Sequence, residues 1–583
     1  MSTPTYPLPI YPTNSSARIA EGFVTPQQDM KVQAARFLPK AVLPVVFLPG
    51  IMGSNLRMSA ERQSATRRKN NIAWRPDVLG PTNVHGASTE TPADRQLRLD
   101  PLQTTVDIYD PSGPSAISGD KRNNNVSFGP GFHSPLLLDD PATAPNGRNA
   151  VQKARARGWG EVFYGSYGAL LQHLESRLNN TFTDGELRAE WHDVIGVDPK
   201  TWGAHASRQQ QTLTENELKE IATRFWFPVH AFGYNWLQHN GVSASVVAER
   251  IKQLINDYAA SGYECYKVIV VTHSMGGLVG RALIHRNYGN IPDKVLGMVH
   301  GVMPAIGAPA AYKRMRAGFE DPGLLHGMKA SIGAKVAGNT GGEVTAVLAN
   351  APGGLELLPT ESYGNGWLRI THGGRDLDTL PKQGDPYNEI YKVRGKWFSL
   401  FREEWINPSR LPPDRGGGTL QRTCNYLDKV QSFHADIAQT FHPNSYAHYG
   451  ADREHRSFGE VVWSINENCT DPAGWQDWSI INDTGDGTLE IGGRPPSSHD
   501  SKILSERTDE LPQPIQATIL APAAPGDQTV PIKSADYQLK SGIFKGVFRQ
   551  VGYEHQSSYE DPHAVASTLY SIVRIAQEAR YKC

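Results

Sequence analysis

The feature that most constrains the fold is a strand, a tight turn and a helix in immediate succession around Ser274. Residues 267–272 are apolar and rich in β-branched side chains, which predicts a buried strand. Gly276 and Gly277 follow the serine, and apolar residues then recur at helical spacing over residues 278–283. A serine on such a turn projects its hydroxyl above a sheet. The segment therefore predicts a nucleophile elbow with Ser274 as the nucleophile.

This elbow departs from the usual GxSxG pattern at one position. Gly276 satisfies the glycine two residues after the serine, but Thr272 stands where the pattern has the other glycine. A side chain at position 272 is expected to crowd the turn. The departure supports an alternative reading, in which the chain is a catalytically silent hydrolase scaffold used for binding.

Strand-like and helix-like segments alternate along much of the chain. Further apolar runs lie at residues 45–48, 227–232, 295–302 and 543–551. Several are too uniformly apolar for a half-exposed antiparallel sheet, so parallel strands are expected. Apolar residues at helical spacing separate them, as in the stripe from Val247 to Tyr258. We therefore expect an α/β fold of the α/β-hydrolase type, with a mostly parallel sheet, flanking helices and catalytic loops at the strands' carboxyl ends.

Composition divides the chain into four parts. Residues 1–40 are rich in Pro, Ser and Thr and predict an irregular N-terminal arm. Residues 41–309 would form the first part of the core, interrupted by a polar insertion at about 57–158. Residues 310–525 would form a cap or lid insertion with part of the core sheet, and residues 526–583 the last part of the core.

A lid is predicted within the cap, at residues 323–338. Apolar side chains recur there every four positions: Leu324, Met328, Ile332 and Val336. A helix with this stripe could present an apolar face to lipid and exclude water from the site. An ordinary helix of the cap would show the same pattern.

An oxyanion hole is expected from two backbone amides. The amide after the nucleophile is that of Met275. The second would come from residues 49–54, PGIMGS, which follow the apolar run 45–48 and contain glycines that allow close approach. Ile51 or Met52 can supply it, and we assign it to Ile51. A tight turn without this role is the alternative.

The general base is predicted to be His555. It follows the strand-like run 543–551 and precedes a final helix in which Asp561 can cap and Pro562 occupies the first turn. His563 is the rival, but it would lie in the first turn of that helix, where the positive end of the dipole disfavours an imidazolium.

Three aspartates compete to orient this histidine. Asp527 is preferred, because it follows the apolar run 517–521 and precedes a single further strand before His555. Asp486 stands in an Asp-Gly pair that favours a type I′ hairpin turn, and Asp452 is the third candidate. The sequence thus predicts the triad Ser274, His555 and Asp527, with no metal and no cofactor.

The net charge and the lengths of the apolar segments limit what the chain is expected to bind. The chain has 58 Lys plus Arg and 59 Asp plus Glu residues, and its net charge of −1 gives no electrostatic footprint for nucleic acid. No segment has the ~18 consecutive apolar residues of a membrane span, so any membrane contact is expected to be peripheral. Residues 1–20 lack the basic start and apolar stretch of a signal peptide. We therefore expect synthesis in the cytoplasm without a signal peptide.

Five motifs, in this order, resemble the lecithin:cholesterol acyltransferase and GPI-inositol-deacylase-like lipases. They are LPGIMGSNL at 48–56, FGYNW at 232–236, HSMGG at 273–277, PGGLELLP at 352–359 and GDQTVP at 526–531. Within that set the chain is most similar to bacterial type VI secretion lipase effectors. This resemblance implies a lipid acyl ester as substrate, with phospholipid favoured, and delivery into the periplasm of a target cell. It also implies an immunity protein and a secretion-apparatus partner. An acyltransferase, in which an alcohol replaces water, stays open on the sequence.

Overall fold

The computed structural model of the chain describes most of its residues. These are 39–78, 90–108, 126–130, 132, 134, 137, 140, 149–183, 185–319, 338–413, 417–469, 472–492 and 514–580, together with the backbone of three strands before residue 38. The predicted lid stripe from Leu324 to Val336 lies outside the described residues. None of the described helices is long and apolar enough to cross a membrane.

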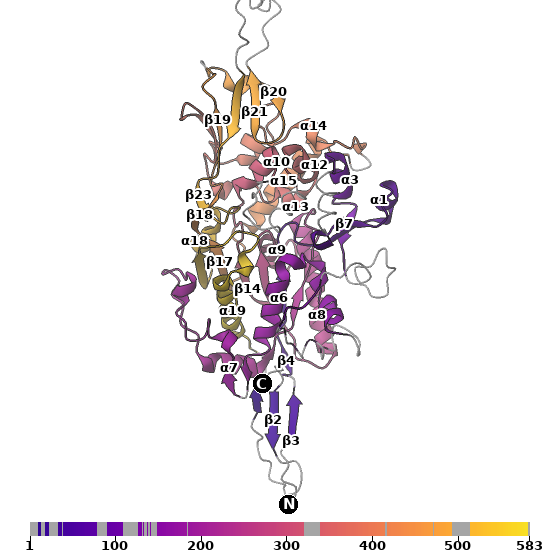
Figure 1. Ribbon diagram of the computed structural model, residues 1–583, viewed down its shortest axis with the longest axis vertical. Coiled ribbons are helices and arrows are strands. Elements are labelled where there is room, and N and C mark those ends of the chain that lie inside the picture. Colours follow the sequence, from indigo (N-terminus) through magenta and orange to yellow (C-terminus); the bar gives the residue numbers. More distant parts are fainter. Residues whose placement is uncertain are drawn as a thin grey trace, which may run out of the picture.

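The central sheet has six strands and lies in the middle of the molecule (Figure 1). In spatial order its strands are β12 (Val229–Ala231), β5 (Val45–Leu48), β13 (Val268–His273), β14 (Val295–Gly301), β17 (Ser445–Gly450) and β24 (Gly546–Gln550). Every adjacent pair is parallel. All residues of β5, β13 and β14 are buried, as continuous apolar runs predict for a sheet covered on both faces. The α/β-hydrolase prediction is thereby confirmed.

Helices cover both faces of this sheet. They include α6 (Tyr164–Leu178), α8 (Asn240–Ala260), α9 (Gly276–Ile284) and α19 (Pro562–Ala576). Because successive strand residues point to opposite faces, Val46 and Leu48 join the apolar cluster of α8 and α9. Val45 and Phe47 join the cluster of α6 and α19 instead. Asp561 caps α19 and Pro562 begins it, as predicted.

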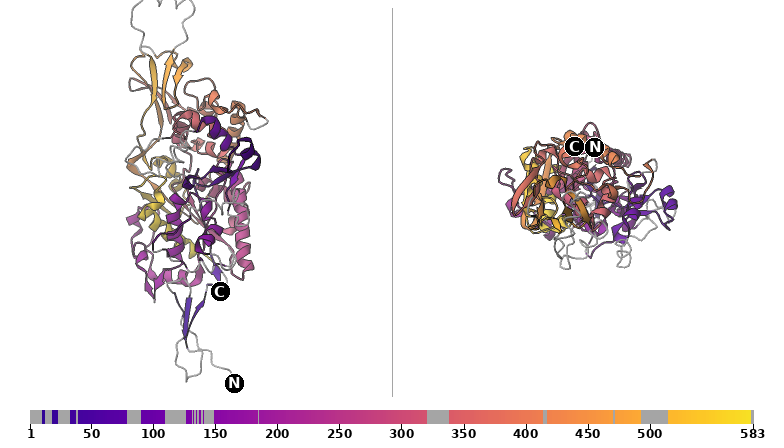
Figure 2. Two further views of the ribbon diagram at one scale, coloured as in Figure 1. Left: turned by 45° about the vertical axis from the view of Figure 1, so that its right-hand side comes forward. Right: turned by 90° about the horizontal axis from the view of Figure 1, so that it is seen from above.

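The segment predicted to form a cap comprises residues before and after β17 in the sequence. Its helices are α10 (Pro309–Ala317), α12 (Gly341–Leu348), α13 (Pro352–Leu355), α14 (Glu403–Ile406) and α15 (Leu420–Ile437). A second six-stranded sheet lies beyond them, in the order β16 (Arg375–Leu380), β15 (Leu368–His372), β19 (Val461–Ile465), β22 (Ile515–Ile519), β21 (Thr488–Gly492) and β20 (Ser479–Asp483). Figure 2 shows this sheet and the N-terminal strands at opposite ends of the molecule.

The hairpin predicted at Asp486 is confirmed, but its turn is not the expected one. Strands β20 and β21 pair antiparallel. The loop between them has four residues, 484–487, and its left-handed residues are Gly485 and Gly487. The Asp486 carboxylate accepts the Thr488 N–H at 2.9 Å. The Asp-Gly pair therefore predicts where the chain turns. It does not predict how many residues the turn contains.

The N-terminal region differs from the irregular arm that its composition predicts. Strands β1 (Ile10–Pro12), β2 (Arg18–Gly22) and β3 (Gln33–Phe37) form an antiparallel sheet. Strands of three to five residues are too short to show a clear alternation of apolar and polar side chains. Whether such a segment forms a strand depends on the neighbouring strands with which it pairs. Within the polar insertion, β6 (Leu56–Met58), β7 (Ile72–Trp74) and β8 (Thr104–Val106) form another small sheet.

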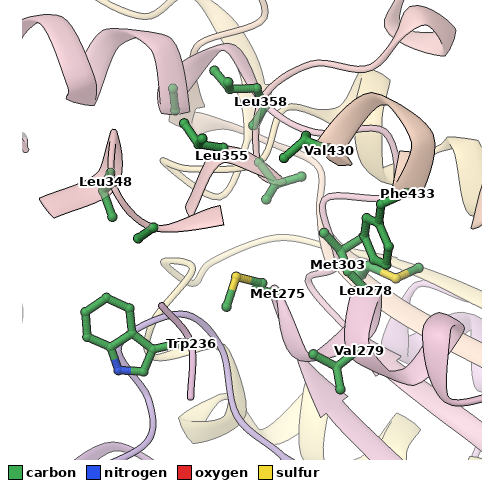
Figure 3. Packing of buried hydrophobic residues seen from close by; sticks show 14 of the residues in the cluster. Trp236, Met275, Leu278, Val279, Met303, Leu348, Leu355, Leu358, Val430 and Phe433 are labelled. Carbon is green, nitrogen blue, oxygen red and sulfur yellow. The ribbon is translucent and has the colours of Figure 1, made fainter. Parts of the chain in front are cut away.

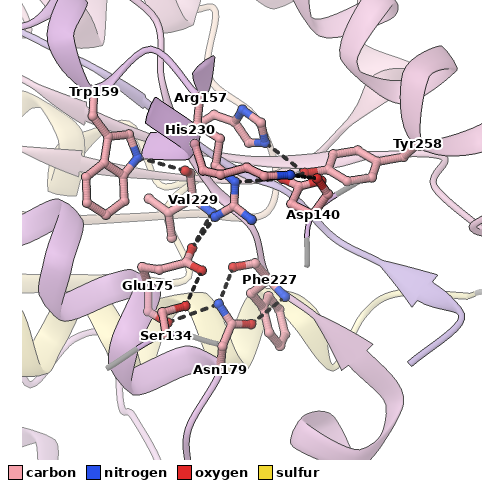
Figure 4. A network of polar contacts seen from close by, with 11 residues as sticks. Ser134, Asp140, Arg157, Trp159, Glu175, Asn179, Phe227, Val229, His230 and Tyr258 are labelled. Carbon is pink, nitrogen blue, oxygen red and sulfur yellow. Dashed lines mark hydrogen bonds and ion pairs between the residues drawn. The ribbon is translucent and has the colours of Figure 1, made fainter. Parts of the chain in front are cut away.

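A buried ion network ties this insertion to the edge of the central sheet (Figure 4). Arg157 has no exposed side-chain surface and contacts Asp140 at 2.8 Å and Glu175 at 2.7 Å. Glu175 also accepts the Val229 N–H, and the Arg157 carbonyl accepts the Ala231 N–H, each at 2.9 Å. Since β12 is the edge strand, these contacts satisfy backbone groups that an open edge would expose.

Candidate active site

The nucleophile turn has the geometry that the sequence predicts. Strand β13 ends at His273, and Ser274 follows in the left-handed region with φ of 53°. Its N–H donates to the Gly301 carbonyl at 2.9 Å on the neighbouring strand β14. A Cβ at Gly276 would lie 2.5 Å from the carbonyl oxygens of Leu48 and Pro49. Only glycine therefore allows α9 to begin this close to β5.

Thr272 fits the elbow because space is provided elsewhere. A Cβ at Gly280, one turn into α9, would lie 3.3 Å from the Thr272 methyl group. The Thr272 hydroxyl is also satisfied, since its Oγ1 lies 3.0 Å from His300 Nδ1. Gly280 on the helix thus leaves room for the Thr272 side chain, which stands where the GxSxG pattern has its first glycine. The crowding expected at position 272 does not distort the turn.

The three residues predicted as a triad lie in one hydrogen-bonded row. His555 Nε2 lies 2.8 Å from Ser274 Oγ, and His555 Nδ1 lies 2.9 Å from Asp527 Oδ2. The other carboxylate oxygen of Asp527 accepts the N–H groups of Thr529 at 3.1 Å and Val530 at 2.7 Å. Asp527 is only 1% exposed, so these three bonds compensate its desolvation. The arrangement can transfer a proton from Ser274 to His555 and stabilise the resulting imidazolium.

The rival residues have other contacts. Asp452, at the start of β18 (Asp452–Ser457), binds the Nδ1 of His455 at 2.8 Å and accepts the Gly552 N–H at 2.9 Å. Asp486 stays in its hairpin within the cap sheet. His563 lies in the first turn of α19, where its backbone N–H binds the capping Asp561.

The loop that carries Ile51 lies against the nucleophile. A Cβ at Gly50 would lie 3.1 Å from Ser274 Cβ, so the loop and the elbow are in direct contact. Within the described part of the chain, neither the Ile51 amide nor the Met275 amide has a hydrogen-bond acceptor. Two unpaired donors on loops that meet at the nucleophile suit an oxyanion. Met52, the alternative, has a left-handed φ of 60°.

Some residues that shape the site carry no sequence motif. The Ser457 hydroxyl, at the end of β18, accepts the Asp527 N–H at 3.1 Å and is fully buried. The Tyr559 hydroxyl donates to the Thr272 carbonyl at 2.9 Å. Val302, on the loop after β14, has a left-handed φ of 46°. Gln528 has one of 71° on the loop after β23 (Ala524–Gly526), but it does belong to a motif, GDQTVP at 526–531. Only the tertiary fold brings these residues to the site.

Apolar side chains of the cap pack against the helix side of the elbow. Figure 3 shows Met275, which precedes α9, and Leu278 of α9 among apolar side chains of the cap, including Leu355 and Phe433. A small pocket of about 70 Å³ is lined by Leu278 and Arg281 of α9 and by residues of α15 such as His434. Burial lowers the pKa of the nearby His448 to about 3, so that residue is neutral at physiological pH. A site of this kind strengthens each hydrogen bond made to a developing charge.

Comparison with known proteins identifies the family. No protein-family model matches the chain, and a search of curated proteins found no match either. Among solved structures, the chain is similar to the one described as the crystal structure of the Tle4–Tli4 complex, with 30% sequence identity and a TM-score of 0.69. The match covers 93% of this chain and 100% of that chain. The wider likeness to lecithin:cholesterol acyltransferase stays an expectation. The chain belongs to the family of Tle4, a type VI secretion lipase effector.

Proposed function

We propose that this member of the family hydrolyses lipid acyl esters, with phospholipid as the favoured substrate, through a Ser274–His555–Asp527 triad. The observation that carries the proposal is the hydrogen-bonded row from Asp527 through His555 to Ser274. The row begins at a left-handed serine beside the carboxyl ends of parallel strands, where α/β enzymes bind their ligands.

The proposed reaction proceeds in two halves. His555 Nε2 takes the Ser274 proton while Oγ attacks the ester carbonyl carbon, and the amides of Ile51 and Met275 stabilise the oxyanion. His555 then gives its proton to the leaving alcohol oxygen as the C–O bond breaks, which leaves an acyl-enzyme. Water, deprotonated by His555, attacks this ester, the bond between the acyl carbon and Ser274 Oγ breaks, and His555 returns the proton to Oγ as the fatty acid leaves. Asp527 holds the Nδ1–H throughout, and the steps require no metal or cofactor.

The biological role that we propose is that of an antibacterial effector, delivered by a type VI apparatus into the periplasm of a rival cell. Its support is family membership, since the Tle4 neighbour was solved as a complex with Tli4. An immunity protein that blocks this enzyme in the producing cell is therefore part of the proposal. Contact with the target membrane would be peripheral.

Two measurements test the chemistry. Ser274 in the full-length protein should react with a fluorophosphonate probe, and mass spectrometry of mixed phospholipids and triacylglycerols should detect released fatty acid. Ser274→Ala should abolish both signals, whereas Ser261→Ala, at the exposed end of α8, should change neither. Labelling that persists in Ser274→Ala, or hydrolysis that is unaffected by it, would refute the proposed nucleophile.

The effector role is tested in a bacterial host. Expression with an added export signal should arrest growth and deplete membrane phospholipids, while cytoplasmic expression should be tolerated better. Ser274→Ala should restore growth. A harmless periplasmic wild-type protein with unchanged phospholipids would contradict the effector role, even if the esterase activity is real.

A further inference from the structure

His273, the residue before the nucleophile, contacts three different parts of the site. It is 1% exposed and lies beneath the loop that carries Ile51, because a Cβ at Gly50 would be 2.8 Å from its Nδ1. Its Nε2 lies 2.9 Å from the backbone carbonyl oxygen of His555. Its Nδ1 lies 3.1 Å from the hydroxyl of Tyr167 on α6. This side chain takes no part in the proposed reaction steps, yet it meets the loop of the predicted base.

The direction of each hydrogen bond follows from the groups involved. A carbonyl oxygen only accepts, so Nε2 of His273 carries the proton and donates to His555. Nδ1 is then an acceptor, and the Tyr167 hydroxyl donates to it. The Tyr167 oxygen in turn accepts the Gly50 N–H at 3.3 Å and the Gln556 side-chain N–H at 3.5 Å. One continuous chain of hydrogen bonds thus runs from the loop after β5 to the loop after β24.

The protonation states that this chain requires are stable over a wide pH range. Burial lowers the pKa of His273 to about 3, so its ring stays neutral. Burial raises the pKa of Tyr167 to about 12, so its hydroxyl keeps its proton. Neither group changes charge between about pH 5 and pH 9, so the hydrogen bonds to the His555 carbonyl and from the Tyr167 hydroxyl determine the imidazole tautomer throughout this range.

We propose that His273 is a positioning residue, which with Tyr167 holds the backbone of His555 and the Ile51 loop in register with Ser274. This inference rests on the proposed function, because its purpose is to align the triad with the oxyanion hole. A displacement of about 1 Å at a catalytic group can cost 100-fold in rate. The hydrogen bond from His273 Nε2 to the His555 carbonyl oxygen, at 2.9 Å, restrains the loop that carries the base. The hydrogen bond from the Tyr167 hydroxyl to His273 Nδ1, at 3.1 Å, restrains the His273 ring.

The test uses three variants of the full-length protein and one matched control. His273→Phe keeps an aromatic ring but loses both hydrogen bonds. His273→Gln keeps an N–H donor and a carbonyl acceptor, and Tyr167→Phe removes only the hydroxyl. The control is His230→Phe, because His230 is another buried histidine bound to a tyrosine hydroxyl, at 3.0 Å from Tyr258, on strand β12 away from the triad (Figure 4).

We expect His273→Phe to lower kcat for a water-soluble short-chain ester by about 10- to 100-fold with little change in KM. The rate of fluorophosphonate labelling of Ser274 should fall in parallel. His273→Gln should recover most of the loss, and Tyr167→Phe should show an intermediate one. The control His230→Phe should lower the thermal midpoint without a comparable loss of kcat.

A role in packing alone would give a different pattern. His273→Phe with the same kcat as His230→Phe, or His273→Gln as impaired as His273→Phe, would overturn the inference. A readout independent of activity is the distance between His555 Nε2 and Ser274 Oγ in a crystal structure of Tyr167→Phe or His273→Phe. It should open beyond 3.5 Å, and an unchanged 2.8 Å would also overturn the inference. A wild-type protein that neither labels nor hydrolyses contradicts the proposed function instead.

Discussion

Replacing Asp527 by asparagine should remove nearly all hydrolysis while the fold is retained. One oxygen of Asp527 accepts two buried backbone N–H groups, and the other accepts the Nδ1–H of His555. Asparagine has one oxygen and one amide nitrogen, so it can meet these donors in only two ways. If its nitrogen faced the two backbone N–H groups, two buried donors would be left unsatisfied, at about 1–3 kcal/mol each.

The favoured orientation therefore keeps the oxygen on the backbone and turns the amide nitrogen toward His555. Nδ1 must then accept, so the proton moves to Nε2 and faces Ser274, which leaves no base for the serine proton. In a serine protease, this same tautomer error lowers kcat by about 10⁴-fold. We expect a loss of similar size here, equivalent to about 5 kcal/mol in the activation barrier.

The assay is kcat for a short-chain ester, with the fluorophosphonate labelling rate and the thermal midpoint measured on the same samples. The matched control is Asp452→Asn, which alters another carboxylate that is bonded to a histidine Nδ1, that of His455, outside the row of Ser274. It should be mild in comparison. If Asp527→Asn kept more than a tenth of the wild-type kcat, or if Asp452→Asn were the more damaging change, the assignment of the acid would be wrong.

Three further predictions concern single substitutions. Ser274→Ala should lower kcat by several orders of magnitude and leave the thermal midpoint nearly unchanged, because it removes one hydroxyl from a turn that is already formed. Gly276→Ala should destabilise the protein by about 1–3 kcal/mol in denaturant unfolding and impair hydrolysis, since the added Cβ would lie 2.5 Å from two backbone oxygens. Glu356→Gln should raise the thermal midpoint, and more at pH 8 than at pH 5. Burial raises the pKa of Glu356 well above its usual value, so the native state loses stability as pH rises above the unfolded pKa. Equal midpoints at pH 8 for Glu356→Gln and wild type would contradict this.

The sequence predicts those parts of the fold whose characteristic residue pattern lies within a short segment of the chain. The parallel strands appear as continuous apolar runs because both faces of the sheet are covered. The last helix is marked by Asp561 and Pro562 at its start, and the structure has the same cap. The elbow is flanked by two such segments, because a buried strand precedes Ser274 and a helix with apolar residues at helical spacing, itself almost wholly buried, follows it.

The features that the sequence does not predict depend on contacts between distant segments. Ser457 binds the backbone of Asp527 across 70 residues, and no local pattern distinguishes it from other serines. Asp452 is paired with a histidine three residues away, a spacing that could have argued against it as the acid of the triad. The sequence favours Asp527 because a single further strand separates it from His555, and the structure has this order, with β24 between the two residues. The strand before Asp527, β23, pairs with β18 and lies outside the central sheet, which chain order alone does not predict.

Backbone strain at the site is maintained by contacts between segments that are distant in the sequence. Ser274, Val302 and Gln528 all have left-handed φ values, at a cost of about 1–3 kcal/mol each for residues other than glycine. Their sum approaches the net stability of a typical domain, about 5–15 kcal/mol, so the surrounding structure must impose it. The three have one further property in common. Each donates its own N–H to the carbonyl of a distant residue: Ser274 to Gly301 at 2.9 Å, Val302 to His448 at 2.8 Å and Gln528 to His455 at 3.1 Å.

These three backbone hydrogen bonds explain why the left-handed conformations persist. Gly301 and His448 belong to β14 and β17, so the elbow and the next loop are each held by the strand beside them. Relaxing Ser274 or Val302 to a right-handed conformation would break its hydrogen bond and leave the carbonyl of a buried residue, Gly301 or His448, without that donor. The parallel sheet thereby stabilises two of these unfavourable conformations, at the ends of β13 and β14, and the contact of Gln528 with β18 stabilises the third. This is a physical reason why the loops there can hold a serine, a histidine and an aspartate in fixed relation although 281 residues separate Ser274 from His555.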